Sequence, residues 1–96
     1  MINIDKIVGL QVITSGAHIL GEVKGATVDT KTWEIKYLNV KLSDKAAESL
    51  GMKKRFGSSV ISVPVGMVLA VAHVVTLDKS LEDLEKSPDV KESKDQ

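Results

Sequence analysis

The feature that most constrains this chain is a change of apolar face within a single predicted strand. Residues 18–29 have the composition of a strand, but Ile19 and Val23 lie in one two-residue register while Val28 lies in the other. Gly25 occupies the point where the register changes. Successive side chains of a strand point to opposite faces, so such a strand keeps its apolar residues inside only through a bulge or a sharp bend. This segment therefore does not fit a flat sheet with one apolar face.

The next predicted strand, residues 33–42, changes face in the same way. Residues 29–32 separate the two strands as a turn, in which the carboxylate of Asp29 can accept a hydrogen bond from the backbone amide two residues later. The apolar side chains on the first face are Trp33, Ile35 and Tyr37, and those on the second are Leu38, Val40 and Leu42. Two adjacent strands that both change face are typical of a coiled hairpin in a small barrel. The residues expected in its core are Ile19, Val23, Val40, Val71 and Val75.

Composition limits the class of protein. A chain of 96 residues forms one domain. Thirteen Lys and Arg balance thirteen Asp and Glu, and this zero net charge disfavours a strongly basic nucleic-acid binder. The absence of cysteine excludes disulfides and cysteine-ligated zinc. We find no secretory signal, and the most apolar stretch, 60–75, is too short and interrupted to span a membrane. We therefore expect a soluble cytoplasmic protein with no membrane insertion.

The remaining pattern predicts a mainly β domain with two short helices. Ser43 is typical of the N-cap of a helix over residues 44–50. Ser80, followed by an acid three residues later, is typical of the N-cap of a second, C-terminal helix. We place the barrel domain at residues 1–86 and expect the polar residues 87–96 to form a disordered tail. The other strands are predicted over residues 7–14, 60–65 and 70–77.

The sequence contains no recognisable catalytic, cofactor-binding or metal-binding motif. His18 and His73 are the only histidines, and neither is spaced from another ligand or nucleophile as a metal site or catalytic pair requires. His73 alternates with Val71 and Val75, which is typical of a histidine at the rim or in the core of a barrel. We therefore expect no enzymatic activity, no cofactor and no tightly bound metal.

One candidate interaction site follows the predicted strand 60–65. Pro64 lacks a backbone donor, so this strand is a candidate for a sheet edge or ends at that residue. If the apolar segment after it is extended, its side chains cannot all point inward. A free edge and uncovered apolar side chains favour a protein partner, including a second copy in a homodimer. Alternatively, the C-terminal helix folds back through Leu81 and Leu84 and covers them. The candidate residues are Val63, Val65, Met67, Val68 and Leu69.

A second candidate site is the one basic cluster with an aromatic neighbour. It consists of Lys53, Lys54, Arg55 and Phe56. Such a cluster can bind RNA phosphates or an acidic protein face, although three cations on a loop are more often simply solvated. Trp33 and Tyr37 share a strand face, as base-stacking aromatic residues do. The more common explanation is that the largest side chains of a small domain lie in its core.

The order of several short motifs resembles the PRC-barrel domain. The resemblance covers about residues 4–85. One departure is the turn after Asp29, where many relatives have a glycine and this chain has Thr32 and Trp33. The motifs are VGLQVITSG at 8–16, ILGEV at 19–23, VDT at 28–30 and LNV at 38–40. The later segments 43–47, 53–65 and 74–84 resemble the short stand-alone PRC-barrel proteins of archaea.

The resemblance implies a small β-barrel that docks on other proteins and has no catalytic residues shared across the family. Relatives include the cytoplasmic domain of the photosynthetic reaction-centre H subunit and the C-terminal domain of a ribosome maturation factor. Some archaeal stand-alone relatives are implicated in cell division as partners of the ring-anchoring protein SepF. A SepF-like partner is therefore one implication for this chain.

From these observations we expect a non-catalytic adaptor that binds another protein or a second copy of itself, with a link to archaeal cell division. The alternative is an RNA-binding or ribosome-assembly accessory domain that uses Lys53, Lys54, Arg55 and the face of Trp33 and Tyr37. Salt dependence separates the two, since phosphate binding weakens steeply with salt and apolar docking does not.

Overall fold

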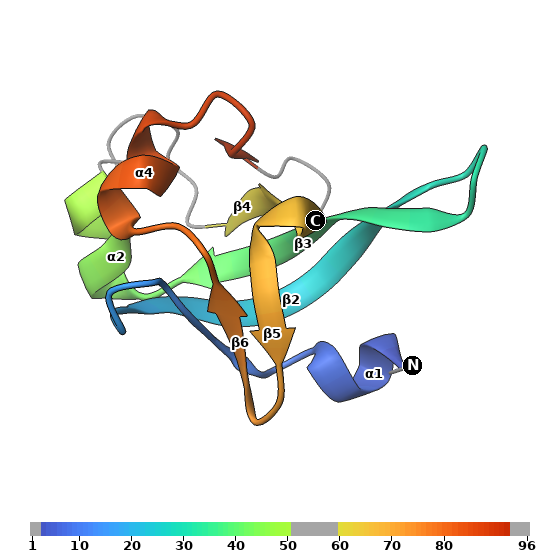
Figure 1. The fold of residues 1–96 in the computed structure, drawn as a ribbon, viewed down its shortest axis with the longest axis horizontal. Helices are drawn as coiled ribbons and strands as arrows, with labels where there is room; N and C mark the ends of the chain where they lie inside the picture. The colour runs from blue at the N-terminus through green and yellow to red at the C-terminus, as the bar shows by residue number, and fades with distance from the viewer. Residues whose placement is uncertain (1–2, 51–59, 93–96) are drawn as a thin grey trace.

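The computed structural model describes residues 3–50 and 60–92 as one curled sheet with short helices (Figure 1). The strand order is β5-β6-β1-β2-β3-β4-β7. Of the described pairs, β1 and β6 run parallel and the others antiparallel. The strands are β1 Gln11–Ile13, β2 Ile19–Asp29, β3 Glu34–Leu42, β4 Val60–Pro64, β5 Val68–Val71, β6 Val74–Leu77 and β7 Lys91–Glu92. The helices are α1 Ile4–Ile7, α2 Asp44–Leu50 and α4 Leu81–Lys86, with a 3-10 turn η1 over Val65–Met67. The expectation of a mainly β fold with a mid-chain and a C-terminal helix is confirmed.

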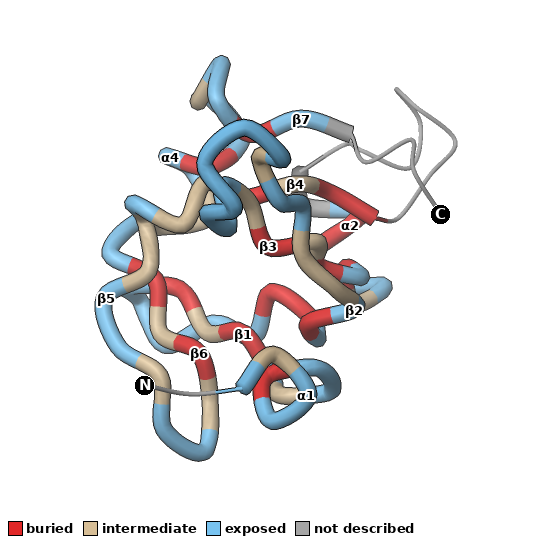
Figure 2. The backbone as a smooth tube through the Cα atoms, turned by 90° about the vertical axis from the view of Figure 1, so that its right-hand side faces the viewer, coloured by how far each residue is buried: buried red, intermediate tan, exposed pale blue. Residues whose placement is uncertain are grey.

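The sheet curls around one apolar core. Turn η1 leads from β4, near one edge of the sheet, to β5 at the other edge, and it contacts β3 on the way. Buried stretches of β1, β6, β3 and β4 surround a common interior (Figure 2). The largest fully buried apolar side chains are Leu20, Ile61, Leu77, Leu84, Val12, Val23, Val40, Val63 and Val75. Val23, Val40 and Val75 are buried as expected, whereas Val71 is only half-buried.

The predicted irregularity at Gly25 is confirmed. The register between β2 and β3 shifts between Val23 and Gly25, and it shifts again between Thr27 and Val28. Such shifts bend a strand pair and increase its twist. Before the first shift, Val23 faces Val40 across the pair and both side chains are buried.

The expectation that Ile19 is buried is wrong. Its side chain is 50% exposed, and Leu20 is fully buried instead. The register between β1 and β2 passes from Gly21 directly to Ile19, which leaves Leu20 as the extra residue of a bulge. Leu20 and Gly21 are therefore both buried although they are adjacent in sequence, and Ile19 is displaced to the surface.

The predicted strand over residues 7–14 is shorter than expected. The chain forms helix α1 up to Ile7, and the strand begins only at Gln11. Gly9 lies between them with φ +93°, and its amide donates to the carbonyl oxygen of Val23 at 2.8 Å. Glycine adopts this left-handed backbone without the steric cost of a side chain. Val8, which lies between helix α1 and Gly9, is exposed.

Strand β4 is an interior strand rather than the expected sheet edge. It pairs with β3 on one side and with β7 on the other. Val63, predicted as an interaction residue, is 0% exposed. Turn η1 interrupts the extended chain after Pro64, so the half-buried Val65 and its neighbours Met67 and Val68 pack against the core. Of the five candidates in this segment, Leu69 on β5 is the one that is exposed, at 69%.

The predicted strand over residues 70–77 is a hairpin of β5 and β6. Its turn includes Ala72 and His73, and the Ala72 amide donates to the carbonyl oxygen of Val74 at 3.0 Å. The alternation of Val71, His73 and Val75 runs across this turn, so His73 is exposed rather than part of a continuous strand face.

Both predicted helix caps are present. The hydroxyl of Ser43 accepts a hydrogen bond from the Ala46 amide, and that of Ser80 accepts one from the Asp83 amide, each at 3.2 Å. These bonds satisfy backbone donors that have no partner within the first turn of a helix.

The chain after helix α4 is part of the folded domain as far as residue 92. Strand β7 pairs with β4, and Val90 before it is only 8% exposed. We expected the domain to end at residue 86 and residues 87–96 to form a disordered tail. In the structure, residues 87–92 are instead part of the domain. Residues 93–96 lie outside the described residues.

Replacing Gly21 by alanine should destabilise the fold by about 1–3 kcal/mol, the usual cost of forcing extra atoms into a packed site. The added Cβ would overlap the carbonyl oxygen of Lys41 and lie 3.0 Å from the Cα of Leu42. Urea unfolding followed by circular dichroism measures the change. Gly66→Ala is the matched control, because its Cβ would meet nothing within 4 Å. Equal stability of the two variants would contradict the close approach of β2 and β3.

Candidate docking site on the β2–β3 hairpin

The outer half of the β2–β3 hairpin projects from the barrel. Residues 27–37, here called the arm, extend beyond the other strands, and their turn lies at the end far from α2 and α4 (Figure 1). The arm begins at the second register shift, where the pairs Thr27–Tyr37 and Val28–Ile35 leave Lys36 as the extra residue. The bulge therefore marks the point beyond which the hairpin leaves the core.

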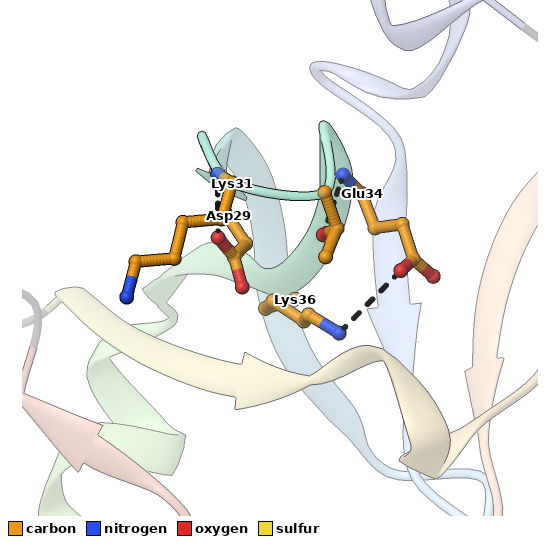
Figure 3. Close-up of polar contacts among 5 residues, drawn as sticks. Asp29, Lys31, Glu34 and Lys36 are labelled. Carbon is orange, nitrogen blue, oxygen red and sulfur yellow. Dashed lines mark hydrogen bonds and ion pairs between the residues drawn. The ribbon is translucent and has the colours of Figure 1, made fainter.

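Backbone and side-chain hydrogen bonds order the turn of the arm. The Asp29 carboxylate accepts from the Lys31 amide at 2.8 Å, as predicted for this turn (Figure 3). The carbonyl oxygen of Asp29 accepts from the Trp33 amide at 2.6 Å. The Thr32 hydroxyl accepts from the Glu34 amide at 3.4 Å (Figure 3). Local bonds of this kind favour one turn conformation over alternatives.

This turn places the side chain of Trp33 in solvent. Its side chain is 77% exposed, so the expectation that it is a core residue is wrong. Its backbone φ is +60°, a left-handed conformation that is uncommon for a bulky residue. This is the turn in which many proteins that the sequence resembles have a glycine. In this chain Trp33, and not a glycine, adopts the left-handed conformation of the turn.

The expected common face of Trp33, Ile35 and Tyr37 is broken by the bulge. Val28 and Ile35 are direct cross-strand partners, and both are exposed. Tyr37 pairs with Thr27, whose side chain points to the face opposite Val28, and Tyr37 is half-buried. The exposed apolar residues of the arm are therefore Val28, Trp33 and Ile35, and the sequence pattern did not reveal this set.

The charged groups of the arm balance. Two carboxylates, Asp29 and Glu34, accompany two ammonium groups, Lys31 and Lys36. The Lys36 Nζ lies 3.9 Å from the Glu34 Oε1 (Figure 3). An exposed pair at this distance contributes little to stability. The arm thus presents apolar surface with no excess of either charge.

The structure does not bring the predicted interaction residues together. Leu69 is exposed on the β5–β6 hairpin, away from the arm, while Val63 is buried. The basic cluster Lys53, Lys54, Arg55 and Phe56 lies outside the described residues.

Among the described residues outside the arm, several line an open hollow beside helix α2. This hollow of about 520 Å³ is lined by Ala17, His18, Ile19, Ser43, Lys45, Ala46 and Leu81. Within residues 3–50 and 60–92, no three His, Asp or Glu side chains lie close enough together to hold a metal ion. In the same residues, no helix has the length and apolar character needed to cross a membrane.

Replacing Trp33 by glycine should raise the free energy of unfolding by about 0.5–1 kcal/mol. Glycine removes the left-handed strain, and this gain exceeds its greater loss of chain entropy. Trp33→Val should instead lower the free energy by about 1 kcal/mol, because a β-branched residue tolerates this backbone poorly. Circular dichroism should follow the unfolding, because Trp33 is the only tryptophan. A loss of more than about 1 kcal/mol in Trp33→Gly would show that the ring stabilises the fold.

Comparison with known proteins gives a likeness of fold. No protein-family model matches the sequence, and no curated protein sequence matches it. A solved structure from Pseudomonas aeruginosa, which carries the name 16S ribosomal RNA processing protein RimM, superposes with a TM-score of 0.58 at 16% sequence identity. The match covers 84% of this chain and 45% of that one, so this chain spans less than half of the compared protein. The likeness supports the PRC-barrel-like architecture that the sequence motifs imply.

Proposed function

We propose that this chain is a non-catalytic accessory domain of ribosome assembly that docks on small-subunit particles through the arm. The observation that carries the proposal is Trp33, a large aromatic side chain held in water at the tip of an ordered, projecting hairpin. The domain would position or recruit other factors rather than perform a chemical step.

The left-handed backbone of Trp33 costs free energy, which a binding contact of its side chain would offset. A left-handed backbone at a non-glycine residue costs about 1–2 kcal/mol. An exposed indole also leaves a large apolar area in water, which burial against a partner would recover. Tryptophan is among the residue types that most often dominate binding energy at interfaces. Val28 and Ile35 are the other exposed apolar residues of the arm.

The fold likeness supports the choice of a ribosomal target. The compared structure carries the name of a 16S ribosomal RNA processing protein, and it shares its fold with 84% of this chain. A ribosome-assembly role was the alternative expectation from the sequence, and this likeness favours it over the cell-division adaptor.

A non-catalytic role agrees with the described surface. The hollows beside His18 and Ile19 are open, whereas active sites usually lie in well-formed clefts or cavities. On the arm, the Asp29 carboxylate accepts a hydrogen bond within the turn and the Glu34 carboxylate pairs with Lys36, so both have structural partners.

The balanced charge of the arm favours contact with a protein component of the particle. Binding to phosphates requires an excess of Lys and Arg, and on the arm each ammonium group is matched by a carboxylate. Apolar docking of Trp33 into a protein pocket requires no such excess. The SepF-like partner and the archaeal stand-alone type stay predictions, because no observation on the described residues bears on them.

The full chain should co-sediment with small ribosomal subunits or their precursors from its source cells. Trp33→Gly should weaken this binding about 30-fold or more, the effect of losing a central interface residue of about 2 kcal/mol. Raising the salt from about 50 to 200 mM should weaken binding less than about tenfold, whereas six to ten phosphate contacts would cost about 10³–10⁵.

The matched control is Leu69→Ala, which removes another highly exposed apolar side chain outside the arm. It should change binding less than about threefold, as most surface substitutions do. Absence of co-sedimentation by the unmodified chain would reject the ribosomal target. Co-sedimentation of Trp33→Gly at the level of the unmodified chain would reject the arm as the docking element.

A further inference from the structure

Two connected hollows lie at the end of the barrel that is far from the tip of the arm (Figure 1). The first, of about 520 Å³, lies between the β1–β2 turn and the starts of helices α2 and α4. The second, of about 470 Å³, lies between the same turn and α4. Both are lined by His18 and Leu81, so they form one continuous groove, here called the end groove. Binding sites for small ligands occupy about 300–1,000 Å³, so each hollow has room for an aromatic side chain.

The end groove carries opposite charges at its two ends. Lys45 lines the first hollow, Glu82 and Glu85 line the second, and all three residues are exposed. The half-buried Leu81 is common to both hollows, so apolar surface lies between the charges. Ile19, whose side chain is 50% exposed, adds to this surface in the first hollow. A ligand that lies along the groove therefore meets a cation, an apolar surface and then carboxylates.

The tip of the arm has the complementary order of groups. Trp33 is its exposed apolar residue, with Lys31 before it and Glu34 after it in the sequence. The side chains of Lys31 and Glu34 extend to opposite sides of the turn (Figure 3). A tip that docks along the end groove can therefore place its cation at the carboxylates of α4 and its own carboxylate at the cation of α2. Complementary charges of this kind fix the orientation of two docked surfaces.

The arm can meet an end groove only on another copy of the chain. The tip and the groove lie at opposite ends of the molecule, so one chain does not bring its own two elements together (Figure 1). Two copies that lie side by side in opposite directions, related by a two-fold axis, place each tip at the groove of the other copy. A contact with this symmetry is made twice and closes on itself.

We propose that the end groove is the docking site for the arm of a second copy, and that two copies form a reciprocal dimer in which each Trp33 packs on Ile19 and Leu81 of the other. Charge matching selects this occupant, because a tip with its charges reversed would face like charges at both ends of the groove. The homodimer expected from the sequence used residues 63–69, whereas this contact uses the arm and the end groove. The dimer does not rest on the ribosomal proposal, although a particle that binds the arm would have to compete with it.

The fluorescence of Trp33 reports directly on the contact, because it is the only tryptophan of the chain. The concentration of the unmodified chain is raised from about 1 μM to about 1 mM, a range that covers moderate and weak affinities. The emission should move to shorter wavelength as the indole leaves water. Light scattering over the same range should rise from the mass of one chain, 10.3 kDa, to twice that value. Trp33→Gly should remain a single chain throughout.

Charge reversal tests the pairing at the acidic end of the groove. Glu82→Lys combined with Glu85→Lys should weaken dimerisation at least tenfold, because Lys31 then meets like charges. Lys31→Glu alone should weaken it in the same way. The chain that carries all three changes should recover most of the lost affinity, which a folding defect cannot explain. Glu48→Lys is the matched control, since it reverses an exposed carboxylate on α2 that lines neither hollow, and it should leave the dimer unchanged.

A chain that stays monomeric with unshifted emission at the highest concentration would overturn the proposal. A dimer that persists in Trp33→Gly would overturn it as well, and so would a charge-reversed groove that Lys31→Glu does not rescue. A mass that keeps rising beyond two chains would indicate open head-to-tail growth and would reject the reciprocal arrangement. No ribosomal particle takes part in these measurements, so their failure is distinct from failure of the ribosomal proposal.

Discussion

The short connection between β4 and β5 is the constraint on which the rest of the fold depends. In the order β5-β6-β1-β2-β3-β4-β7 these two strands are five positions apart, yet only Val65–Met67 join them. Adjacent strands lie about 4.8 Å apart, so a flat sheet would separate β4 from β5 by about 24 Å. The chain from Pro64 to Val68 spans at most about 14 Å. The sheet must therefore curl until its two sides approach, and the curl creates the enclosed apolar core.

The same curl explains why a docking element projects from the barrel. Strand β2 has 11 residues, whereas β1, β5 and β6 have three or four. The curled wall uses only the inner part of the long hairpin, and the bulges near Gly25 and Lys36 redirect the remainder. The local bonds of Asp29 and Thr32 then order the tip without support from the core. Trp33 is exposed as a consequence of this geometry.

The arm differs from the rest of the barrel because it is ordered by its own local hydrogen bonds. The arm projects from the barrel and is apolar at its tip, and its turn is already ordered by hydrogen bonds. Binding through the arm would therefore not cost the conformational entropy of ordering it.

The sequence by itself determined the features that depend on neighbouring residues. The caps at Ser43 and Ser80, the bond from the Lys31 amide to Asp29 and the irregularity at Gly25 each involve local stereochemistry, and all four are present. The approximate positions of β2 and β3 follow from alternation for the same reason.

Tertiary structure decided which side of each strand faces inward and which strands have free edges. The burial of Leu20 in place of Ile19 depends on a bulge opposite β1, and the interior place of β4 depends on β7, about thirty residues later in the sequence. The exposure of Trp33 depends on where the barrel wall ends, because alternation specifies two faces but not which one meets the core. Candidate interaction residues chosen from hydrophobicity alone, such as Val63, were therefore found in the core, since burial is a property of the assembled sheet.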